Sequence, residues 1–314
     1  MDLAPRRLLA LVLAGTLLAA APARAWNQPG HMMTASIAYD QLTPEQRAAV
    51  VKILEANPDF ARWKETAPKD APDFDFGRYV LMMAARWPDD IRKGREDPPD
   101  KPVSPYEHSV WHYVDFPLRP PDFPMEEPPT GTEDLFSAYA FCEKKVTAPD
   151  TSPVDRAAYL CWLLHLTGDI QQPLHAVALF NATYPKGDKG GNDYYVNLAG
   201  NSIKLHTYWD GLGAVMMDFP ELVTHATNLE KKFPRASLPQ LEADKDVRSW
   251  ALESRQLSID AVYRRGTLPG TSNKDQTILP PLPGDYATKG RAIAEQRIVM
   301  AGYRIADLLV RLGL

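Results

Sequence analysis

The chain has 314 residues, of which 45% are hydrophobic and 24% charged, and its formal net charge is −5. This composition is that of a globular protein, and it excludes a disordered or a collagen-like chain. The acidic balance also disfavours a protein that holds duplex DNA on a broad basic surface, but it allows an enzyme that holds nucleic acid at one site.

The first 25 residues show, in order, the features of a cleavable export signal. Two arginines at residues 6–7 precede an apolar run over residues 8–21, which is too short to remain as a membrane-spanning helix. Ala23-Arg24-Ala25 then matches an A-x-A cleavage site. We therefore expect a signal peptide over residues 1–25 and a mature chain over 26–314 that begins at Trp26. The mature protein is expected to be exported, to the periplasm or outside the cell, without stable membrane association. Its new α-amino group, with a pKa near about 8, could bind a metal ion once deprotonated.

Helix signals dominate the mature chain. Thr43-Pro44-Glu45-Gln46 is a capping box with proline at the first helical position, and it predicts a helix through about residue 54. Ser152-Pro153-Val154-Asp155 predicts a second helix in the same way. Further helices are predicted over residues 133–146, 214–230, 246–264 and 287–313.

Strand signals are few. Residues 193–198, followed by Ala199-Gly200-Asn201, predict one arm of a short β-hairpin. The proline-rich segments 94–130 and 266–286 are typical of long surface loops, which often frame a site. The expected class is all-α: one large helical domain over 26–314 with long irregular loops and one short hairpin.

The chain has two cysteines, Cys142 and Cys161. In an oxidising compartment they could form one disulfide, but the sequence leaves this open. Because two cysteines cannot build a zinc–thiolate site, a metal ion would have to be held by imidazole and carboxylate groups.

Five of the seven histidines have neighbours that indicate metal binding. His165 and Asp169 lie four residues apart and would share one helix face, and His206 and Asp210 repeat this spacing. One such pair is often only a structural hydrogen bond, but two pairs with His31, His112 and His175 predict catalytic zinc. His108 and His225 lack comparable neighbours, and we expect ordinary surface or core roles for them.

The order of these motifs resembles that of the zinc-dependent, single-strand-specific nucleases and 3′-nucleotidases of fungi, plants and bacteria. Zinc-dependent phospholipase C shares their fold. The resemblance covers residues 26 to 210, and its motifs are specific only in combination. They are Trp26-x4-His31, Trp87-Pro88-Asp89 with Arg92, His112-Tyr113-Val114-Asp115, His165-x3-Asp169-x5-His175, Gly190-Gly191-Asn192 and His206-x2-Trp209-Asp210.

The resemblance implies three zinc ions and assigns a ligand set to each. The ligands would be Asp89, His112, His165 and Asp169 for the first ion; the amino nitrogen and carbonyl oxygen of Trp26 with His31 for the second, which Asp169 would bridge to the first; and His175, His206 and Asp210 for the third.

The neighbouring carboxylate of Asp90 is an alternative ligand to Asp89. Asp89 is preferred because it keeps the Trp-x-Asp-x-x-Arg spacing that ends at Arg92.

The activity implied is hydrolysis of single-stranded RNA and DNA to 5′-phosphorylated products, with 3′-nucleotidase activity. A hydroxide between the two zinc ions that share Asp169 would attack phosphorus in line. Arg92 would donate to the phosphate or the leaving oxygen, or would instead form a salt bridge with a ligand carboxylate. Tyr113 would stack a base and Asp115 would accept hydrogen bonds from the base edge, or these two residues would have only packing and supporting roles.

Two other functions remain open from the sequence. One is a zinc-dependent phospholipase C, although those enzymes have glutamate where this chain has Asp210. The other is a non-catalytic exported zinc-binding helical protein. The sequence does not determine base or sugar preference, biological role or oligomeric state, and we expect a monomer.

Overall fold

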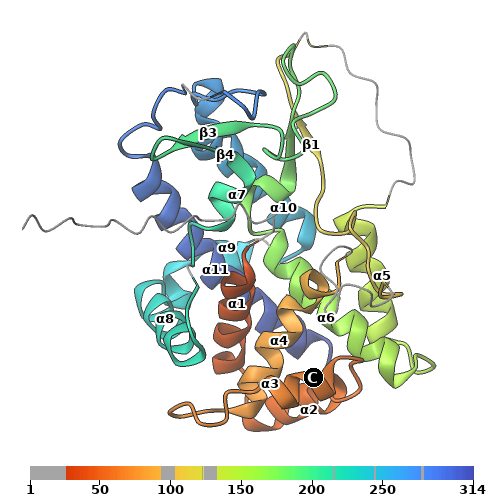
Figure 1. Ribbon diagram of the computed structural model, residues 1–314. Helices are drawn as coiled ribbons and strands as arrows, with labels where there is room; N and C mark the ends of the chain where they lie inside the picture. Colours follow the sequence, from red (N-terminus) through yellow and green to blue (C-terminus); the bar gives the residue numbers. More distant parts are fainter. Residues whose placement is uncertain are drawn as a thin grey trace, which may run out of the picture.

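The computed structural model describes residues 26–92, 103–121, 123, 133–214, 216–243, 245–276 and 279–314. The expected signal peptide, residues 1–25, lies outside the described residues, as does part of the proline-rich loop after residue 92. Figure 1 shows a helical body with two small sheets together at one end. This arrangement confirms the all-α class.

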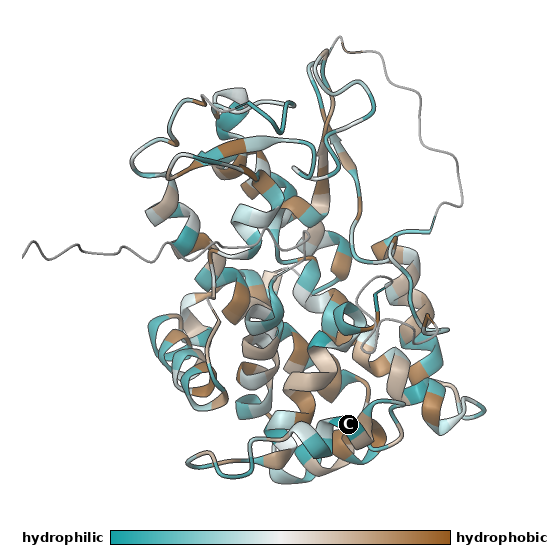
Figure 2. Cartoon of the chain, viewed as in Figure 1, coloured by the Kyte–Doolittle hydropathy of each residue, from teal (hydrophilic) through white to brown (hydrophobic). Residues whose placement is uncertain are grey.

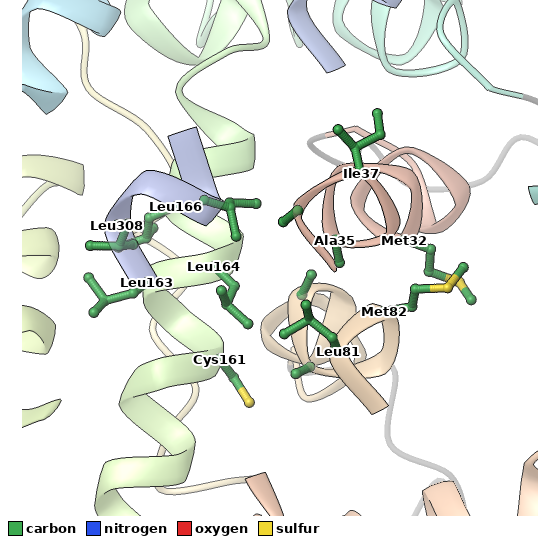
Figure 3. Packing of buried hydrophobic residues seen from close by; sticks show 14 of the residues in the cluster. Met32, Ala35, Ile37, Leu81, Met82, Cys161, Leu163, Leu164, Leu166 and Leu308 are labelled. Carbon is green, nitrogen blue, oxygen red and sulfur yellow. The ribbon is translucent and has the colours of Figure 1, made fainter. Parts of the chain in front are cut away.

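Four helices form the centre of the body: α1 (Gln28–Gln41), α4 (Phe76–Asp90), α6 (Pro153–Asp169) and α11 (Tyr286–Arg311). α1 packs against α4, α8 and α11, and α4 packs against α6. Figure 3 shows side chains of α1, α4 and α6, such as Ala35, Leu81 and Leu164, meeting in this core.

The remaining helices surround this centre. Figure 2 shows both hydrophobic and hydrophilic residues on α8, as expected for an amphipathic helix at the surface. The elements are α2 (Pro44–Leu54), α3 (Phe60–Thr66), α5 (Leu135–Thr147), the 3₁₀ turn η1 (Pro173–Ala176), α7 (Leu205–Asp210), α8 (Phe219–Lys232), η2 (Arg235–Ser237), α9 (Gln240–Ala243), α10 (Val247–Leu257), the π-helical turn η3 (Ser258–Val262) and η4 (Arg264–Gly266).

The helix starts follow from local capping. Thr43 and Gln46 form both bonds of the predicted capping box of α2, and the Ser152 side chain accepts from the Asp155 N–H at the start of α6. α8 begins at Phe219 rather than at residue 214, because Asp218 is its N-cap and forms a capping box with Glu221.

The sequence analysis missed α1, α3, α4 and the short α9, and it marked α7 only through the helical spacing of His206 and Asp210. α1 is buried along nearly its whole length, from Pro29 to Tyr39. A helix surrounded by protein has no polar face, so it lacks the amphipathic period by which helices are recognised. α4 has Pro88 inside its last turn, which is unfavourable by propensity alone.

The predicted hairpin is confirmed as β3 (Tyr195–Leu198) and β4 (Asn201–Lys204), paired antiparallel. Ala199 and Gly200, at its turn, both have positive φ (51° and 89°), as a tight two-residue turn requires. A second, unpredicted sheet pairs β1 (Phe116–Leu118) in parallel with β2 (Val177–Leu179), and Phe116 lies opposite Val177. This pairing brings the chain after His112 alongside the chain after His175.

Cys142 and Cys161 are both buried free thiols, so the disulfide that the sequence left open is not formed. Burial raises the pKa of both thiols. The described helices include none with the length and apolar character needed to cross a membrane.

Candidate metal centre

The histidines and aspartates singled out in the sequence converge in the interior of the helical body. They come from α1, the end of α4, the segment before β1, the end of α6, η1 and α7. Three groups each bring ligand atoms within 4.8 Å of one another, and all members are buried. The groups are His31, Asp89 and His165; His112, His165 and Asp169; and His175, His206 and Asp210.

Asp169 belongs to the second group and also contacts His31 of the first. Its Oδ1 is 3.2 Å from His31 Nε2, whereas its Oδ2 is 3.0 Å from His112 Nδ1 and 3.1 Å from His165 Nε2. The rings of His31 and His165 stack with centroids 4.0 Å apart. The two carboxylate oxygens therefore face different histidines, as a carboxylate shared by two metal ions would require.

Backbone carbonyls orient three of the imidazoles. Nδ1 of His165 donates to the Ala85 carbonyl at 2.8 Å, and Nδ1 of His175 donates to the His112 carbonyl at 2.6 Å. Nδ1 of His206 donates to the Gly190 carbonyl at 2.6 Å. Each bond fixes the tautomer and leaves Nε2 available as a ligand, which is the usual second-sphere arrangement at metal sites.

Several buried polar atoms make no hydrogen bond with any described residue. In this cluster they include both ring nitrogens of His31, Nε2 of His112 and Oδ1 of Asp169, although His31 Nε2 and Asp169 Oδ1 approach each other to 3.2 Å. A buried polar atom without a hydrogen bond costs about 1–3 kcal/mol, so such atoms would be a penalty in a purely structural cluster. Metal coordination would satisfy these atoms, and the residues present therefore fit a metal centre.

The protonation states of four of the five imidazoles also suit metal binding, whereas the charge of Asp169 raises the pKa of His165 against the effect of burial. Burial lowers the pKa of His112 to about 4 and that of His206 to about 3, so both imidazoles are neutral at pH 7. Burial lowers the pKa values of His31 and His175 as well. Burial alone would raise the pKa of Asp169, but the surrounding histidines outweigh it and hold that pKa well below its usual range. Neutral imidazole and ionised carboxylate are the forms that coordinate metal ions.

Trp26 and Asn27 lie beside the same cluster. The buried indole Nε1 of Trp26 donates to the Gly168 carbonyl at 3.0 Å, one residue before Asp169. The Asn27 N–H donates to the Asp210 carbonyl at 3.4 Å. The residue expected to become the N-terminus is thus held between two of the ligand-bearing helices, α6 and α7.

The structure separates Asp89 from Asp90. Asp89 is fully buried and belongs to the group with His31 and His165. Asp90 instead accepts two hydrogen bonds from Arg86, each 2.8 Å long, and one from Gln28 at 2.8 Å. This geometry favours Asp89 as the metal ligand.

The chain matches the S1/P1 nuclease family model over residues 26–312. It belongs to the S1/P1 nuclease family. It is 26% identical to endonuclease 4 of Arabidopsis thaliana over 91% of this chain and 89% of that protein, and 24% identical to endonuclease 3 of the same plant over 91% and 88%. Endonuclease 5 of Arabidopsis thaliana is 31% identical over about half of each chain, 49% and 50%. The protein is therefore a nuclease, a hydrolase whose substrate is nucleic acid.

The residues expected to contact substrate in this S1/P1 nuclease lie near the ligand groups in sequence and are more exposed than they are. Arg92 Nη1 is 3.5 Å from Asp89 Oδ1, and its side chain is 27% exposed. Tyr113 is 39% exposed, and Asp115 is exposed as well. Val114, between them, is buried and its N–H donates to the His175 carbonyl at 2.9 Å. Desolvation and the charge of Asp188 raise the pKa of Asp115 to about 6.

Two supporting residues escaped the sequence analysis. Gln172 Nε2 donates to Asp210 Oδ1 at 2.7 Å. Asp188 is fully buried, where it accepts from the Tyr263 hydroxyl at 2.6 Å and from the Leu179 N–H at 2.8 Å. Both residues lie close in sequence to recognised motifs, Gln172 between Asp169 and His175 and Asp188 just before Gly190, but their partners are distant in the chain.

Gly190 explains part of the Gly190-Gly191-Asn192 motif. Its φ is 59°, and a Cβ at this position would lie 2.5 Å from the Leu174 carbonyl oxygen. Only glycine therefore allows the loop to approach η1 and present the carbonyl that orients His206.

Proposed function

We propose that this nuclease is an exported, zinc-dependent enzyme that cleaves single-stranded RNA and DNA to 5′-phosphorylated products and also hydrolyses 3′-nucleotides. The observation that carries the proposal is the buried convergence of five imidazoles and three carboxylates around Asp169. This donor set, which lacks thiolates, suits zinc in a catalytic setting.

The proposed ligands divide among three zinc ions. The two groups that meet at His165, together with the two-sided contacts of Asp169, support a pair of neighbouring ions. The third group, on η1 and α7, shares no member with them, although His175 Nδ1 lies 3.9 Å from Asp169 Oδ2. The ligands would be Asp89, His112, His165 and Asp169; Asp169 and His31 with the amino nitrogen and carbonyl oxygen of Trp26; and His175, His206 and Asp210.

The bound ions would supply Lewis-acid chemistry, lowering the pKa of coordinated water towards about 7 and neutralising phosphate charge. Arg92 would donate from its partly exposed guanidinium to a phosphate oxygen or to the leaving oxygen. The positive charge of three zinc ions, only partly offset by three aspartates, explains how an acidic protein could hold a polyanion.

Tyr113 and Asp115 would select single strands. Their exposure on either side of buried Val114 leaves the tyrosine ring free to stack a base and the carboxylate free to accept from the base edge. Stacking contributes roughly 1–3 kcal/mol per base and tolerates any sequence. A base in this position has left its duplex, so paired substrates would be poor ones.

The proposal is tested with a purified chain of residues 26–314. Single-stranded DNA, single-stranded RNA, duplex DNA, 3′-AMP and phosphatidylcholine vesicles are incubated with it, with and without a chelator, and bound zinc is counted by mass analysis. We expect cleavage of single strands and of 3′-AMP that stops with chelator and returns with zinc. Cleavage unaffected by chelation, equal cleavage of duplex DNA, or faster release of phosphocholine than of nucleotides would contradict the proposal.

Asp169→Asn provides a sharper test of the centre. The substitution keeps the shape of the side chain but removes the charge that both neighbouring groups share, so activity should fall by three orders of magnitude or more. Circular dichroism should show unchanged helix content. The control is Asp193→Asn, which alters an exposed ion pair with Lys189 and should leave turnover at the wild-type level. If Asp169→Asn also retains wild-type turnover, the centre is assigned wrongly.

A further inference from the structure

The turn between Asp169 and His175 is bound by side chains of three elements late in the chain, α10, η3 and α11. The Ser254 hydroxyl of α10 donates to the Ile170 carbonyl at 2.5 Å, and the Ser258 hydroxyl of η3 donates to the Pro173 carbonyl at 2.7 Å. Arg297 Nε of α11 donates to the Gln171 carbonyl at 3.1 Å. Three carbonyls of one short turn are thus bound by side chains that follow it by more than eighty residues.

The arginine belongs to a buried ionic triad. Glu253 of α10 accepts from Arg297 and, through both oxygens, from Arg304 at 2.9 and 2.6 Å. The two arginine side chains are 3% and 2% exposed, and that of Glu253 is 14% exposed. Arg304 also donates to the Gln171 side-chain oxygen at 2.8 Å. The triad therefore forms hydrogen bonds with both the backbone and the side chain of Gln171.

Stability alone does not explain such a triad. Two buried cations with one anion have a high desolvation cost, and replacing buried ion pairs by apolar residues of similar volume is often neutral or stabilising. What this triad adds is a fixed position for the turn between the end of α6 and the start of η1.

The same turn reaches the third ligand group directly. Gln172 Nε2 donates to Asp210 Oδ1 at 2.7 Å, while its Oε1 accepts from the Leu174 N–H at 2.6 Å. Gln172 is fully buried and caps η1, the element that carries His175. The turn is therefore the physical link between Asp169 and the group of His175, His206 and Asp210.

We propose that the triad of Glu253, Arg297 and Arg304, acting with Gln172, positions the third ligand group relative to Asp169. These are positioning residues: they touch the turn and Asp210, not the substrate. The inference rests on the proposed function, because it concerns how the three proposed zinc sites are spaced. Loss of these contacts should weaken zinc binding at the third site more than at the two sites that share Asp169.

Two variants test this assignment by different routes. The first replaces the whole triad by apolar residues of similar size (Glu253→Leu, Arg297→Met and Arg304→Met), so that no unpaired charge is left buried. The second is Gln172→Leu, which removes only the contacts with Asp210 and Leu174. The matched control is Arg235→Met, which breaks the exposed Arg235–Asp307 pair near the far end of α11.

Three measurements are made on each protein: zinc bound per chain at buffered free zinc, thermal unfolding of the metal-free chain, and separate kcat and KM values on 3′-AMP. We expect both variants to fold without metal, with unfolding temperatures somewhat below that of the wild type because buried groups such as the Leu174 N–H and the Gln171 carbonyl lose their partners. We also expect them to bind one zinc ion ten- to a hundredfold more weakly and to lose kcat by a similar factor. The control should match the wild type in all three.

Wild-type zinc affinity and kcat in the folded variants would overturn the positioning role, leaving the proposed function intact. If the triple variant does not fold, the test rests on Gln172→Leu alone. Wild-type zinc affinity and kcat in that variant would overturn the inference. A wild-type chain that binds no zinc refutes the proposed function, and with it this inference, before any variant is compared.

Discussion

Gly168, in the last turn of α6, is a residue of low helix propensity whose small size is required by its neighbours. Glycine in a helix interior is less favourable than alanine by about 0.5–1 kcal/mol. A Cβ at this position would lie 3.0 Å from His31 Nδ1 and 3.3 Å from its Cε1. The missing side chain is thus what allows His31 to stack on His165 beside Asp169.

Gly168→Ala should therefore separate stability from metal binding. The better helix former is expected to leave the metal-free protein as stable as the wild type, or up to about 1 kcal/mol more stable. The displaced imidazole should weaken zinc binding tenfold or more. Thermal unfolding in chelator and zinc titration measure the two effects. Gly284→Ala, where a Cβ would meet open space, is the control, and equal zinc affinity in both variants would refute the prediction.

At the scale of elements, the crossing of α1 and α11 depends on Gly302. A Cβ there would lie 2.5 Å from Ile37 Cγ2 and 2.9 Å from the Thr34 carbonyl oxygen. Because the Thr34 carbonyl oxygen is a backbone atom, a Cβ at this position would force α1 and α11 apart. This close crossing supports α1, the helix that carries His31.

Gly302→Ala should lower the free energy of unfolding by about 1–3 kcal/mol through overpacking. Denaturant unfolding of the metal-free chain measures the loss. Thr288→Ala, at an exposed position on the same helix, should change stability by less than about 0.5 kcal/mol. Equal effects of the two substitutions would show that the crossing is not tight.

The contact of α8 with α1 should make stability depend on pH. Burial and the charge of Asp40 raise the pKa of Glu230 to about 7, although Gln41 donates to its carboxylate and Arg78 lies near. Tyr303 of α11 also faces this carboxyl group. Between the ordinary glutamate pKa and 7 the folded state holds more protons than the unfolded state. Stability must therefore fall as pH rises through this range.

Glu230→Gln removes this proton linkage. The unfolding temperature of the wild type should fall relative to that of the variant as pH rises from 5 to 8, because only the wild type must ionise a disfavoured carboxyl group. Melting curves across this range test the difference. The exposed substitution Glu65→Gln should follow the wild-type curve, and parallel curves for all three proteins would contradict the linkage.

For the whole molecule, the proposed metal centre depends on removal of the expected signal peptide, which would expose the Trp26 amino group. The indole contact with Gly168 holds this residue beside Asp169 whether or not a residue precedes it. One extra alanine before Trp26 should therefore leave folding unchanged but replace the amine by an amide, which is a poor metal ligand. We expect about one zinc ion fewer per chain and at least a hundredfold loss of kcat. An alanine added after Leu314 is the control, and full zinc content in both proteins would remove Trp26 from the ligand set.

The sequence alone was informative wherever chemistry depends on short spacings. The pairs His165–Asp169 and His206–Asp210 each lie on one helix, because a four-residue interval is one helical turn. The capping box at Thr43 and the hairpin at residues 195–204 are equally local and were correctly predicted. Repeated in order along the chain, such motifs were enough to indicate the family.

Only the tertiary structure decided what depends on contacts between distant segments. It favoured Asp89 over Asp90, paired β1 with β2, kept both cysteines as thiols and placed α10 and α11 behind the Asp169 turn. The physical reason is that side-chain periodicity reports which face of an element is apolar, but not which partner covers it. Buried polar contacts such as Gln172 with Asp210 leave no periodic trace at all. Residue types and intervals thus predicted which residues could serve as metal ligands, and packing determined how those residues are held.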